Sequence, residues 1–543
     1  MISDNTKPPT EPDQQVKKFI LDLLNSNKFI DAKKEIYKQI TKYPNSSILY
    51  NILGGVLSGQ NQLDESIVCY KKAIKINPNY AQAYNNLGTA LHKLKKVNEA
   101  VDCYKKALSL KTDFAEAFNN MGNAIRELGR PKESLQYFEK AIHIKSDYSQ
   151  AYNNLGVTLA DVGNKEAALE NLQKAIKIKP DYAEVYNSIG LVFNDLARFD
   201  EAISSYNKAI KLQPNYEKPY NNLGNLLSNL GKFDMASSIF HQAIKIKPDY
   251  AKAYSNLLFS LNYKTDFDIE TYLSEAKKLG LNWKLNKKNL SIKYKYEKNP
   301  KKLKIGLVSA DFGNHPGGYF TMSTLKELRK KNFELISYSC SDRRDGFAHH
   351  FRPLFSKWHS IEKKEDEEIV KQIVEDGIHI LIDLQGHSAS NRLPIFIYKS
   401  APIQASWLAQ GSTGISEIDY FIGSHHITPK NDEKHFIEKI LRLPEISQCF
   451  TPPDFDVKIN SLPAKKNNFI TFGCINKLTK INDDVITLWS KVLLSVPNSK
   501  LLLKNANLDN KKIIDSIFDR FEKNNINKKR LILRGRSSTR KEL

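Results

Sequence analysis

Two histidines follow predicted buried strands, where an imidazole could take part in proton transfer. The segment KIGLVSADF (304–312) predicts a buried strand, and the tight loop GNHPGG that follows holds His315. His387 follows a second predicted strand, IHILIDLQG (378–386), in the turn GHSAS. Doubly wound sheets bind ligands at the carboxyl ends of their strands, and the unperturbed pKa of imidazole lies near neutral. His315 could therefore accept a hydroxyl proton or position an acceptor, or it could instead cap its loop. His387 could contact a substrate or, equally, make a structural hydrogen bond.

Strands that alternate with helices must position these histidines. YFTMSTLKELRK and EDEEIVKQIVEDG predict helices, and the further predicted strands are FELISYS (333–339), PIQASWLA (402–409) and IDYFIG (418–423). This alternation favours a parallel, doubly wound sheet. A second unit of the same kind begins at FITFGCI (469–475), continues through a helix near DDVITLWSKVLLSV, and reaches the predicted strands SKLLLKN and RLILRG.

The first half of the chain has a different organisation, a period of 34 residues. The segments AQAYNNLG, AEAFNNMG, SQAYNNLG, AEVYNSIG and EKPYNNLG recur at this interval from Ala81, Ala115, Ser149, Ala183 and Glu217. The period and the residue pattern are typical of tetratricopeptide repeats, in which stacked helix pairs bury a continuous core. We count six full repeats with degenerate flanks. The array predicts a binding surface, so any chemistry must lie after it.

One polar position of the array could bind a protein substrate. An asparagine recurs there, interrupted by Ser188, at Asn86, Asn120, Asn154, Asn222 and Asn256. Successive copies would line the concave face, and an amide that both donates and accepts could grip the backbone of an extended peptide. The alternative, that these asparagines do not bind a substrate, is equally open, because asparagine is common at this position in tetratricopeptide repeats of many functions.

These patterns divide the chain into successive segments. We expect a disordered N-terminus at 1–14, a helical cap at 15–46, the tetratricopeptide array at 47–283, a linker at 284–302, a first α/β lobe at 303–455, a linker at 456–467, and a partial second lobe at 468–543.

Composition limits the partners and the compartment. The chain has 543 residues and a formal net charge of +22, but the excess is mostly lysine spread over predicted helix surfaces, without a nucleic-acid motif. Diffuse lysine mainly provides solubility, so we expect no specific nucleic-acid partner. No apolar run approaches the roughly 18 residues of a membrane span, and the five cysteines show no paired metal or redox spacing. We therefore expect a cytoplasmic protein with no membrane partner.

Five motifs after the array resemble those of a known enzyme family. KIGLVSADFGNHPGGYF, EDGIHILIDLQGHSASNRL, SAPIQASWL, STGISEIDYFIG and FGCINKLTKI occur in the order found in the tetratricopeptide-containing O-GlcNAc transferases and the related SPINDLY-type proteins. The resemblance implies two Rossmann-like lobes of the GT-B type with the active site between them. It also implies transfer of a sugar from a nucleotide donor to Ser or Thr of proteins, with the asparagine ladder holding the acceptor.

The resemblance further implies roles for individual residues. It supports a catalytic role for His315, and Asp376 matches an acidic position considered for proton handling, although Asp-Gly by itself indicates a helix-ending turn. Lys480 ends INKLTKI and matches the family lysine that stabilises charge on the leaving diphosphate. Lys477 would contact the donor, although relatives usually carry Gln or Asn there. An ammonium group and helix N-terminal amides can replace a metal, so we expect no cofactor or metal ion.

The implied donor segment is not found in the sequence. In the family the second lobe continues with a Thr-rich, glycine-containing loop that clasps the nucleotide, and nothing similar follows RGRSSTRKEL. We therefore expect an incomplete second lobe, weak donor binding and slow turnover. The expected function is transfer of N-acetylglucosamine from UDP-GlcNAc. The alternatives are a non-catalytic tetratricopeptide scaffold with a degenerate transferase domain, and an O-fucosyltransferase that uses GDP-fucose.

Overall fold

The computed structural model describes residues 11–537, apart from 27, 265, 342–344, 453–460 and 536. Most of the predicted disordered N-terminus and the first part of the predicted linker at 456–467 thus lie outside the described residues. The chain divides into two compact units, Met1–Pro214 and Asn215–Leu543. We describe each unit by itself.

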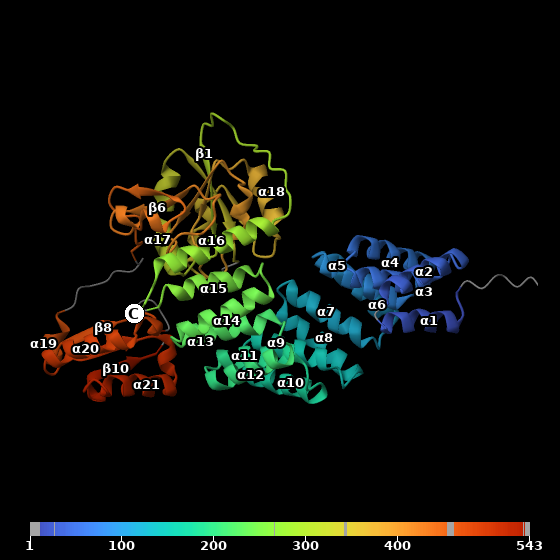
Figure 1. Ribbon diagram of the computed structural model, residues 1–543, viewed down its shortest axis with the longest axis horizontal. Helices are drawn as coiled ribbons and strands as arrows, with labels where there is room; N and C mark the ends of the chain where they lie inside the picture. The colour runs from blue at the N-terminus through green and yellow to red at the C-terminus, as the bar shows by residue number, and fades with distance from the viewer. Residues whose placement is uncertain are drawn as a thin grey trace, which may run out of the picture. The chain divides into compact units, whose positions relative to one another are not determined.

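The first unit consists of six helix pairs (Figure 1). The first pair, α1 (Gln14–Asn25) and α2 (Phe29–Lys42), occupies the segment expected to form a cap. The five pairs that follow are α3 (Ser47–Gly59) and α4 (Leu63–Ile76), α5 (Ala81–Lys93) and α6 (Val97–Leu110), α7 (Ala115–Glu127) and α8 (Pro131–Ile144), α9 (Ser149–Asp161) and α10 (Lys165–Ile178), and α11 (Ala183–Asp195) and α12 (Phe199–Leu212).

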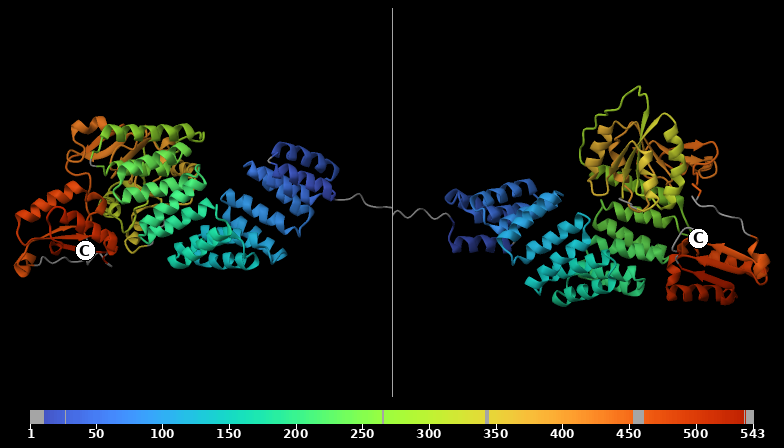
Figure 2. Two further views of the ribbon diagram at one scale, coloured as in Figure 1. Left: turned by 60° about the horizontal axis from the view of Figure 1, so that its bottom comes forward. Right: turned by 180° about the vertical axis from the view of Figure 1, so that it is seen from behind.

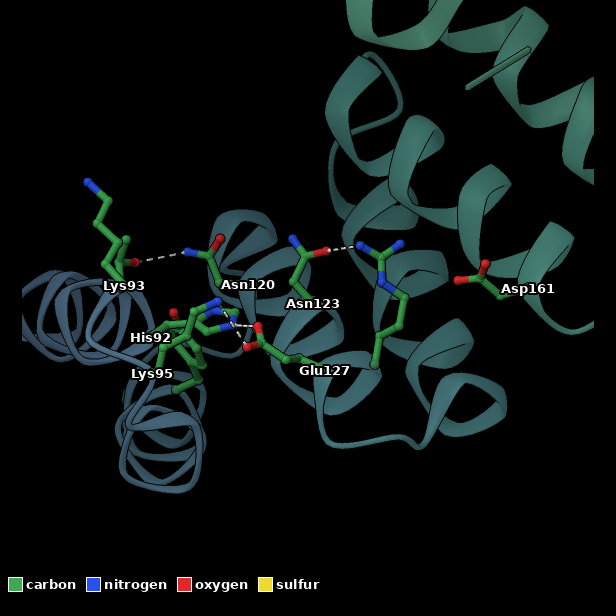
Figure 3. A pocket seen from close by; sticks show the side chains of 10 residues that line it. His92, Lys93, Lys95, Asn120, Asn123, Glu127 and Asp161 are labelled. Carbon is green, nitrogen blue, oxygen red and sulfur yellow. Dashed lines mark hydrogen bonds and ion pairs between the residues drawn. The ribbon is translucent and has the colours of Figure 1, made fainter. Parts of the chain in front are cut away.

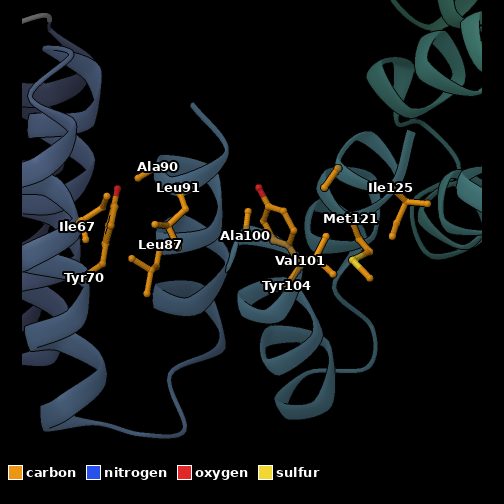
Figure 4. Packing of buried hydrophobic residues seen from close by; sticks show 11 residues of the cluster. Ile67, Tyr70, Leu87, Ala90, Leu91, Ala100, Val101, Tyr104, Met121 and Ile125 are labelled. Atoms are coloured by element: carbon orange, nitrogen blue, oxygen red, sulfur yellow. The ribbon is translucent and has the colours of Figure 1, made fainter. Parts of the chain in front are cut away.

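An apolar core joins the neighbouring repeats from α4 to α7 in the first unit. Leu87 and Leu91 of α5 lie between Tyr70 of α4 and the side chains of α6, and the packing continues into α7 (Figure 4). Gly88 permits the close approach of α5 to α6, because a Cβ atom there would lie only 2.6 Å from the ring of Tyr104. The 34-residue spacing repeats this contact along the unit.

The second unit begins with the last helices of the array. These are α13 (Glu217–Asn229), α14 (Phe233–Ile246), α15 (Ala251–Leu261) and α16 (Ile269–Asn286). Asp268 caps α16, since its carboxylate accepts hydrogen bonds from the backbone N–H groups of Glu270 and Thr271, each at 3.1 Å. Asp268 is therefore the N-cap residue of α16.

A parallel seven-stranded sheet follows, with the order β3-β2-β1-β4-β5-β6-β7. Leu303 pairs with Phe333, and Ile305 pairs with Ile380, so the strand order changes direction between β1 and β4. Helices α17 (Pro316–Lys330) and α18 (Asp366–Asp376) belong to its crossovers. The strands are β1 (Leu303–Ser309), β2 (Phe333–Ser339), β3 (Lys357–Ser360), β4 (Ile380–Asp383), β5 (Ile403–Trp407), β6 (Tyr420–Ser424) and β7 (Lys439–Leu443).

The last part of the chain, red in Figure 2, forms a small α/β layer. Its three parallel strands have the order β10-β9-β8, and Leu503 and Phe521 are fully buried in its core. The elements are α19 (Pro463–Asn467), β8 (Thr471–Cys474), α20 (Asp483–Ser495), β9 (Lys500–Lys504), α21 (Lys511–Glu522) and β10 (Leu531–Arg534). In the described part of the chain, no helix is both long enough and apolar enough to cross a membrane.

Helix α16 is locked against the first sheet by backbone contact. A Cβ atom on Gly280 would overlap the carbonyl oxygen of Gly414, and Gly414 itself has a φ of +76°. The hydroxyl of Tyr272 donates a hydrogen bond to the carbonyl of Ser412 at 3.2 Å, and Lys284 pairs with Glu417 at 2.7 Å. The last helices of the array thus form one body with the sheet.

We expect Gly280→Ala to lower the free energy of unfolding of this unit by about 1–3 kcal/mol, because the obstacle is backbone that cannot rotate away. Urea denaturation followed by tryptophan fluorescence measures the unfolding of this unit, since all four tryptophans lie within 215–543. Gly346→Ala is the control, because a Cβ atom there would meet nothing within 4 Å. Equal unfolding midpoints for the two variants would contradict the close packing.

Candidate functional site

A cavity of about 390 Å³ opens where the strand order of the first sheet changes direction. Its lining residues follow the carboxyl ends of β1, β2, β3 and β4, the place where doubly wound sheets bind ligands. They are Ala310, Asp311, His315, Ser341, Glu362, Ser388, Ala389 and Ser390. The sequence analysis singled out only His315 among them.

His315 is both a helix cap and a side chain of this cavity. Its Nδ1 atom accepts a hydrogen bond from the backbone N–H of Gly317 at 3.2 Å, at the start of α17. The capping alternative is therefore confirmed as one of its roles. The same Nδ1 atom lies 3.1 Å from Oδ2 of Asp311, and the imidazole is 41% exposed. His315 is thus held at one nitrogen and accessible at the cavity.

The two partners of Nδ1 favour different tautomers of His315. When Nδ1 accepts from Gly317, the ring proton of a neutral imidazole is on Nε2. When Nδ1 carries the proton and donates to the carboxylate of Asp311, Nε2 has a free lone pair and can accept a proton. Asp311 therefore favours the tautomer that a general base needs. Its place four residues before His315 was a signal that the sequence analysis did not use.

The loop after β4 is held by a buried carboxylate, Asp383. Its oxygens accept hydrogen bonds from the backbone N–H groups of Gln385 at 3.2 Å and Gly386 at 2.8 Å, and from the hydroxyl of Ser406 at 2.8 Å. Burial raises the pKa of Asp383 to about 6, against the opposing effect of these bonds. Asp383 thus fixes the course of the loop that brings Ser388 to the cavity.

His387 lies in the same loop but is buried on another side. Its Nε2 atom bonds to the carbonyl of Thr413 at 3.0 Å, and burial lowers the pKa of the imidazole to about 4. It lines a separate space of only about 10 Å³, together with Tyr272 and Gln385. The structure therefore shows the hydrogen bond that the sequence analysis named as the alternative, and it does not bring His387 into the cavity with His315.

Asp376 is the last residue of α18, before β4 begins, whereas His315 follows the end of β1. Its buried carboxylate accepts hydrogen bonds from Tyr338 at 2.8 Å and Lys357 at 2.9 Å, and lies 2.9 Å from Nε2 of His359. Burial alone would raise the pKa of Asp376, but these partners together lower it. The proton-handling role predicted for Asp376 has no geometric support, because the carboxylate is enclosed by structural partners.

Lys477 and Lys480 lie after β8 of the second sheet. Lys480 is exposed, at the end of a short 3-10 helix, Leu478–Lys480. The Nζ atom of Lys477 lies 5.1 Å from the ring centroid of Phe259, and desolvation together with the charge of Lys480 lowers the pKa of Lys477. Both lysines follow the carboxyl end of a parallel strand, as expected for donor contacts.

The recurring asparagines connect neighbouring repeats within each unit. In the first unit, Asn86 donates to Asn51 at 3.0 Å, Asn120 to Asn85 at 3.0 Å and Asn154 to Asn119 at 2.8 Å. In the second unit, Asn256 donates to Asn221 at 2.8 Å, and Asn222 also has a partner. Each of these four hydrogen bonds uses an Nδ2 donor. Peptide binding by the ladder stays a prediction.

Comparisons with known proteins agree with this architecture. Residues 257–450 match the Glycosyl transferase family 41 model. Models described as tetratricopeptide repeat match residues 81–114, 113–181 and 218–250, and one described as TPR repeat matches 57–95 and 192–231.

Individual relatives point the same way. The chain is 32% identical over 213 residues to a protein of Petunia hybrida named probable UDP-N-acetylglucosamine–peptide N-acetylglucosaminyltransferase SPINDLY, a match that covers 38% of this chain and 23% of the relative. It is also 32% identical over 224 residues to one of Arabidopsis thaliana with the same description and the name SEC, covering 37% of this chain and 22% of the relative. The matched part thus spans about a quarter of these relatives.

A solved structure of a mutant O-GlcNAc transferase from Thermobaculum terrenum superposes with a TM-score of 0.63 at 26% identity, covering 72% of this chain and 76% of that one. The resemblance inferred from the motifs and the predicted fold class are therefore confirmed. The chain combines a tetratricopeptide solenoid with an α/β segment that matches the Glycosyl transferase family 41 model.

We expect Asp376→Asn to lower the free energy of unfolding at neutral pH by about 2–3 kcal/mol, because Lys357 loses its charged hydrogen-bond acceptor. The folded pKa of Asp376 is depressed, so its contribution is complete above the unfolded pKa of about 3.9 and is lost as the pH falls through the folded value. Urea unfolding of wild type and variant at neutral pH and near pH 3 should show a difference that shrinks in acid.

Glu375→Gln, at an exposed neighbour on α18, is the matched control for this measurement and should leave the unfolding midpoint unchanged. A wild-type midpoint for Asp376→Asn at neutral pH would contradict the structural role of that carboxylate.

Proposed function

We propose that this chain, which carries tetratricopeptide repeats and a Glycosyl transferase family 41 segment, is a protein O-glycosyltransferase that transfers N-acetylglucosamine from UDP-GlcNAc to Ser or Thr hydroxyls. The observation that carries the proposal is the Asp311–His315 pair at the cavity where the strand order changes direction. This pair lies inside the matched segment. The names of the relatives support the donor and the acceptor class.

The acceptor side of the reaction uses Nε2 of His315. With Nδ1 protonated and donating to Asp311, Nε2 accepts the proton of the Ser or Thr hydroxyl. The hydroxyl oxygen forms its new bond to the anomeric carbon of the sugar. The bond from that carbon to the diphosphate oxygen breaks, and its electron pair leaves with the diphosphate. His315 thus keeps the proton while the negative charge accumulates on the leaving group.

The donor side of the reaction uses Lys480. An ammonium group that approaches the leaving diphosphate stabilises the charge formed in the transition state, as a metal ion does in other transferases. We therefore propose a metal-independent reaction, with Lys477 as a second cation near the donor. Acceptor proteins would lie along the repeats, where an amide oxygen such as Oδ1 of Asn120 can accept a peptide N–H group.

We expect Lys480→Ala to reduce sugar transfer at least about 100-fold, because the leaving group loses its counter-charge. The assay follows radiolabelled sugar from UDP-GlcNAc into Ser- and Thr-containing peptides, with EDTA present. Lys491→Ala, at an exposed lysine on α20, is the control and should transfer at the wild-type rate.

The assay also separates the alternatives. Transfer from GDP-fucose alone would mean that the sugar is wrongly assigned. Full activity of Lys480→Ala would refute the donor-side role. A wild-type chain that binds peptides but transfers neither sugar would be a non-catalytic scaffold.

A further inference from the structure

A polar groove of about 580 Å³ lies in the first unit. Its walls come from α5, α6, α7 and α9. Figure 3 shows Asn120 and Asn123 projecting side by side, with His92 and Glu127 on one side and Asp161 on the other. Lysine and arginine side chains line it together with these groups. A groove of this composition is suited to a polar, extended ligand.

Part of the charge in this groove is neutralised within the protein. Glu127 lies 2.7 Å from Nε2 of His92 and 3.4 Å from Nζ of Lys95. Burial would raise the pKa of Glu127, but these partners lower it below its ordinary value. Glu127 therefore remains ionised and already paired, and is not a strong site for a ligand cation.

Arg126, in contrast, has only weak partners. Its Nη1 donates to the hydroxyl of Thr158 at 3.3 Å, and its Nη2 to the amide oxygen of Asn123 at 3.5 Å. Both bonds are long, and a guanidinium carries five N–H donors. Within the described residues Arg126 makes no ion pair with a carboxylate. Burial lowers the pKa of this guanidinium, opposed by the more distant charges of Asp161 and Glu127. A half-buried cation with spare donors suits a ligand carboxylate in bidentate contact.

Two amides beside Arg126 can hold a peptide backbone. Asn120 uses its Nδ2 atom for hydrogen bonds to Asn85 at 3.0 Å and Thr89 at 3.4 Å, which leaves its Oδ1 atom to accept a backbone N–H. Asn123 accepts from Arg126 through Oδ1, which leaves its Nδ2 atom to donate to a backbone carbonyl. The two residues are three apart on α7, so they face the same side of the helix.

We propose that this groove binds an extended peptide segment with an Asp or Glu side chain, whose carboxylate contacts Arg126 while its backbone contacts Asn120 and Asn123. The inference rests on the proposed function, because the peptide segment would be part of an acceptor protein. Asp161 lies across the groove and disfavours a second acidic residue, so the preference is for a single carboxylate.

Fluorescence anisotropy of the full chain tests this with short, blocked, labelled peptides of Gly, Ala and Ser that carry one central Glu, Gln or Lys. We expect the Glu peptide to bind about tenfold more tightly than the Gln peptide, because it forms a charged hydrogen-bond pair. Arg126→Gln should bring this ratio close to one. Asp161→Asn should raise the ratio, which a merely misfolded variant would not do.

Arg130→Gln is the matched control, because Arg130 is exposed, pairs with Glu133 at 2.8 Å and does not line the groove. It should leave the ratio unchanged. Equal binding of the Glu and Gln peptides, tighter binding of the Lys peptide, or a ratio that survives Arg126→Gln would overturn the inference.

The outcomes for the site and for the function are distinguishable, because the binding measurement needs no sugar. If the Glu peptide binds more tightly than the Gln peptide but no sugar is transferred, the proposed function is contradicted and the inference about the groove is not. If sugar is transferred but the Glu and Gln peptides bind equally, the inference about the groove is contradicted and the proposed function is not.

Discussion

The change of direction between β1 and β4 is the constraint on which the first lobe depends. Crossovers from these adjacent strands leave toward opposite sides of the sheet, so the loops at their carboxyl ends diverge and leave space between them. Asp311 and His315 approach that space from one loop, and Ser388 from the other. The parallel ladder holds the carboxyl ends of β1 and β4 next to each other, so the two loops begin side by side. The cavity follows from the topology, and the side chains give it its chemistry.

Buried carboxylates hold this frame in place without taking part in the proposed chemistry. Asp383 ties the loop after β4 to β5, and Asp376 joins the end of α18 to β2 and β3. Each has several hydrogen bonds, as a carboxyl group in a low-dielectric interior requires. By contrast, Asp311 has an accessible histidine as a partner at the cavity. The three carboxylates are the same type of residue and differ only in what surrounds them.

The sequence predicted the repeats and most of the first sheet well, because both depend on local periodicity. The 34-residue interval determines the helix pairs, and apolar runs such as 304–312 determine the buried strands. Strands β3 (KWHS) and β7 (KILRL) were not predicted, because each is a short, partly exposed edge strand without a continuous apolar run. Their burial depends on neighbours that are distant in sequence.

Side-chain orientation was the harder part of the candidate site. His315 and His387 both follow buried strands, and no local signal distinguished the histidine at the cavity from the one bonded to Thr413. Similarly, the partners of Asp376 come from two strands earlier in the chain, so its enclosure could not be read from the Asp-Gly turn. The position of a loop after a buried strand predicted that it lies near the cavity. Tertiary contacts determine which side-chain atoms of that loop are accessible in the cavity.

The most direct test of the Asp311–His315 pair as a catalytic unit is a double-mutant cycle on the rate of sugar transfer. Kinetics with UDP-GlcNAc and a Ser-containing peptide would compare wild type, Asp311→Asn, His315→Ala and the double variant, each checked for native folding. Groups that act together are not additive, so we expect each single change to lower kcat/KM by about 100-fold or more, and the double variant to be no slower than His315→Ala. Independent, multiplicative losses, or a fully active Asp311→Asn, would contradict the account.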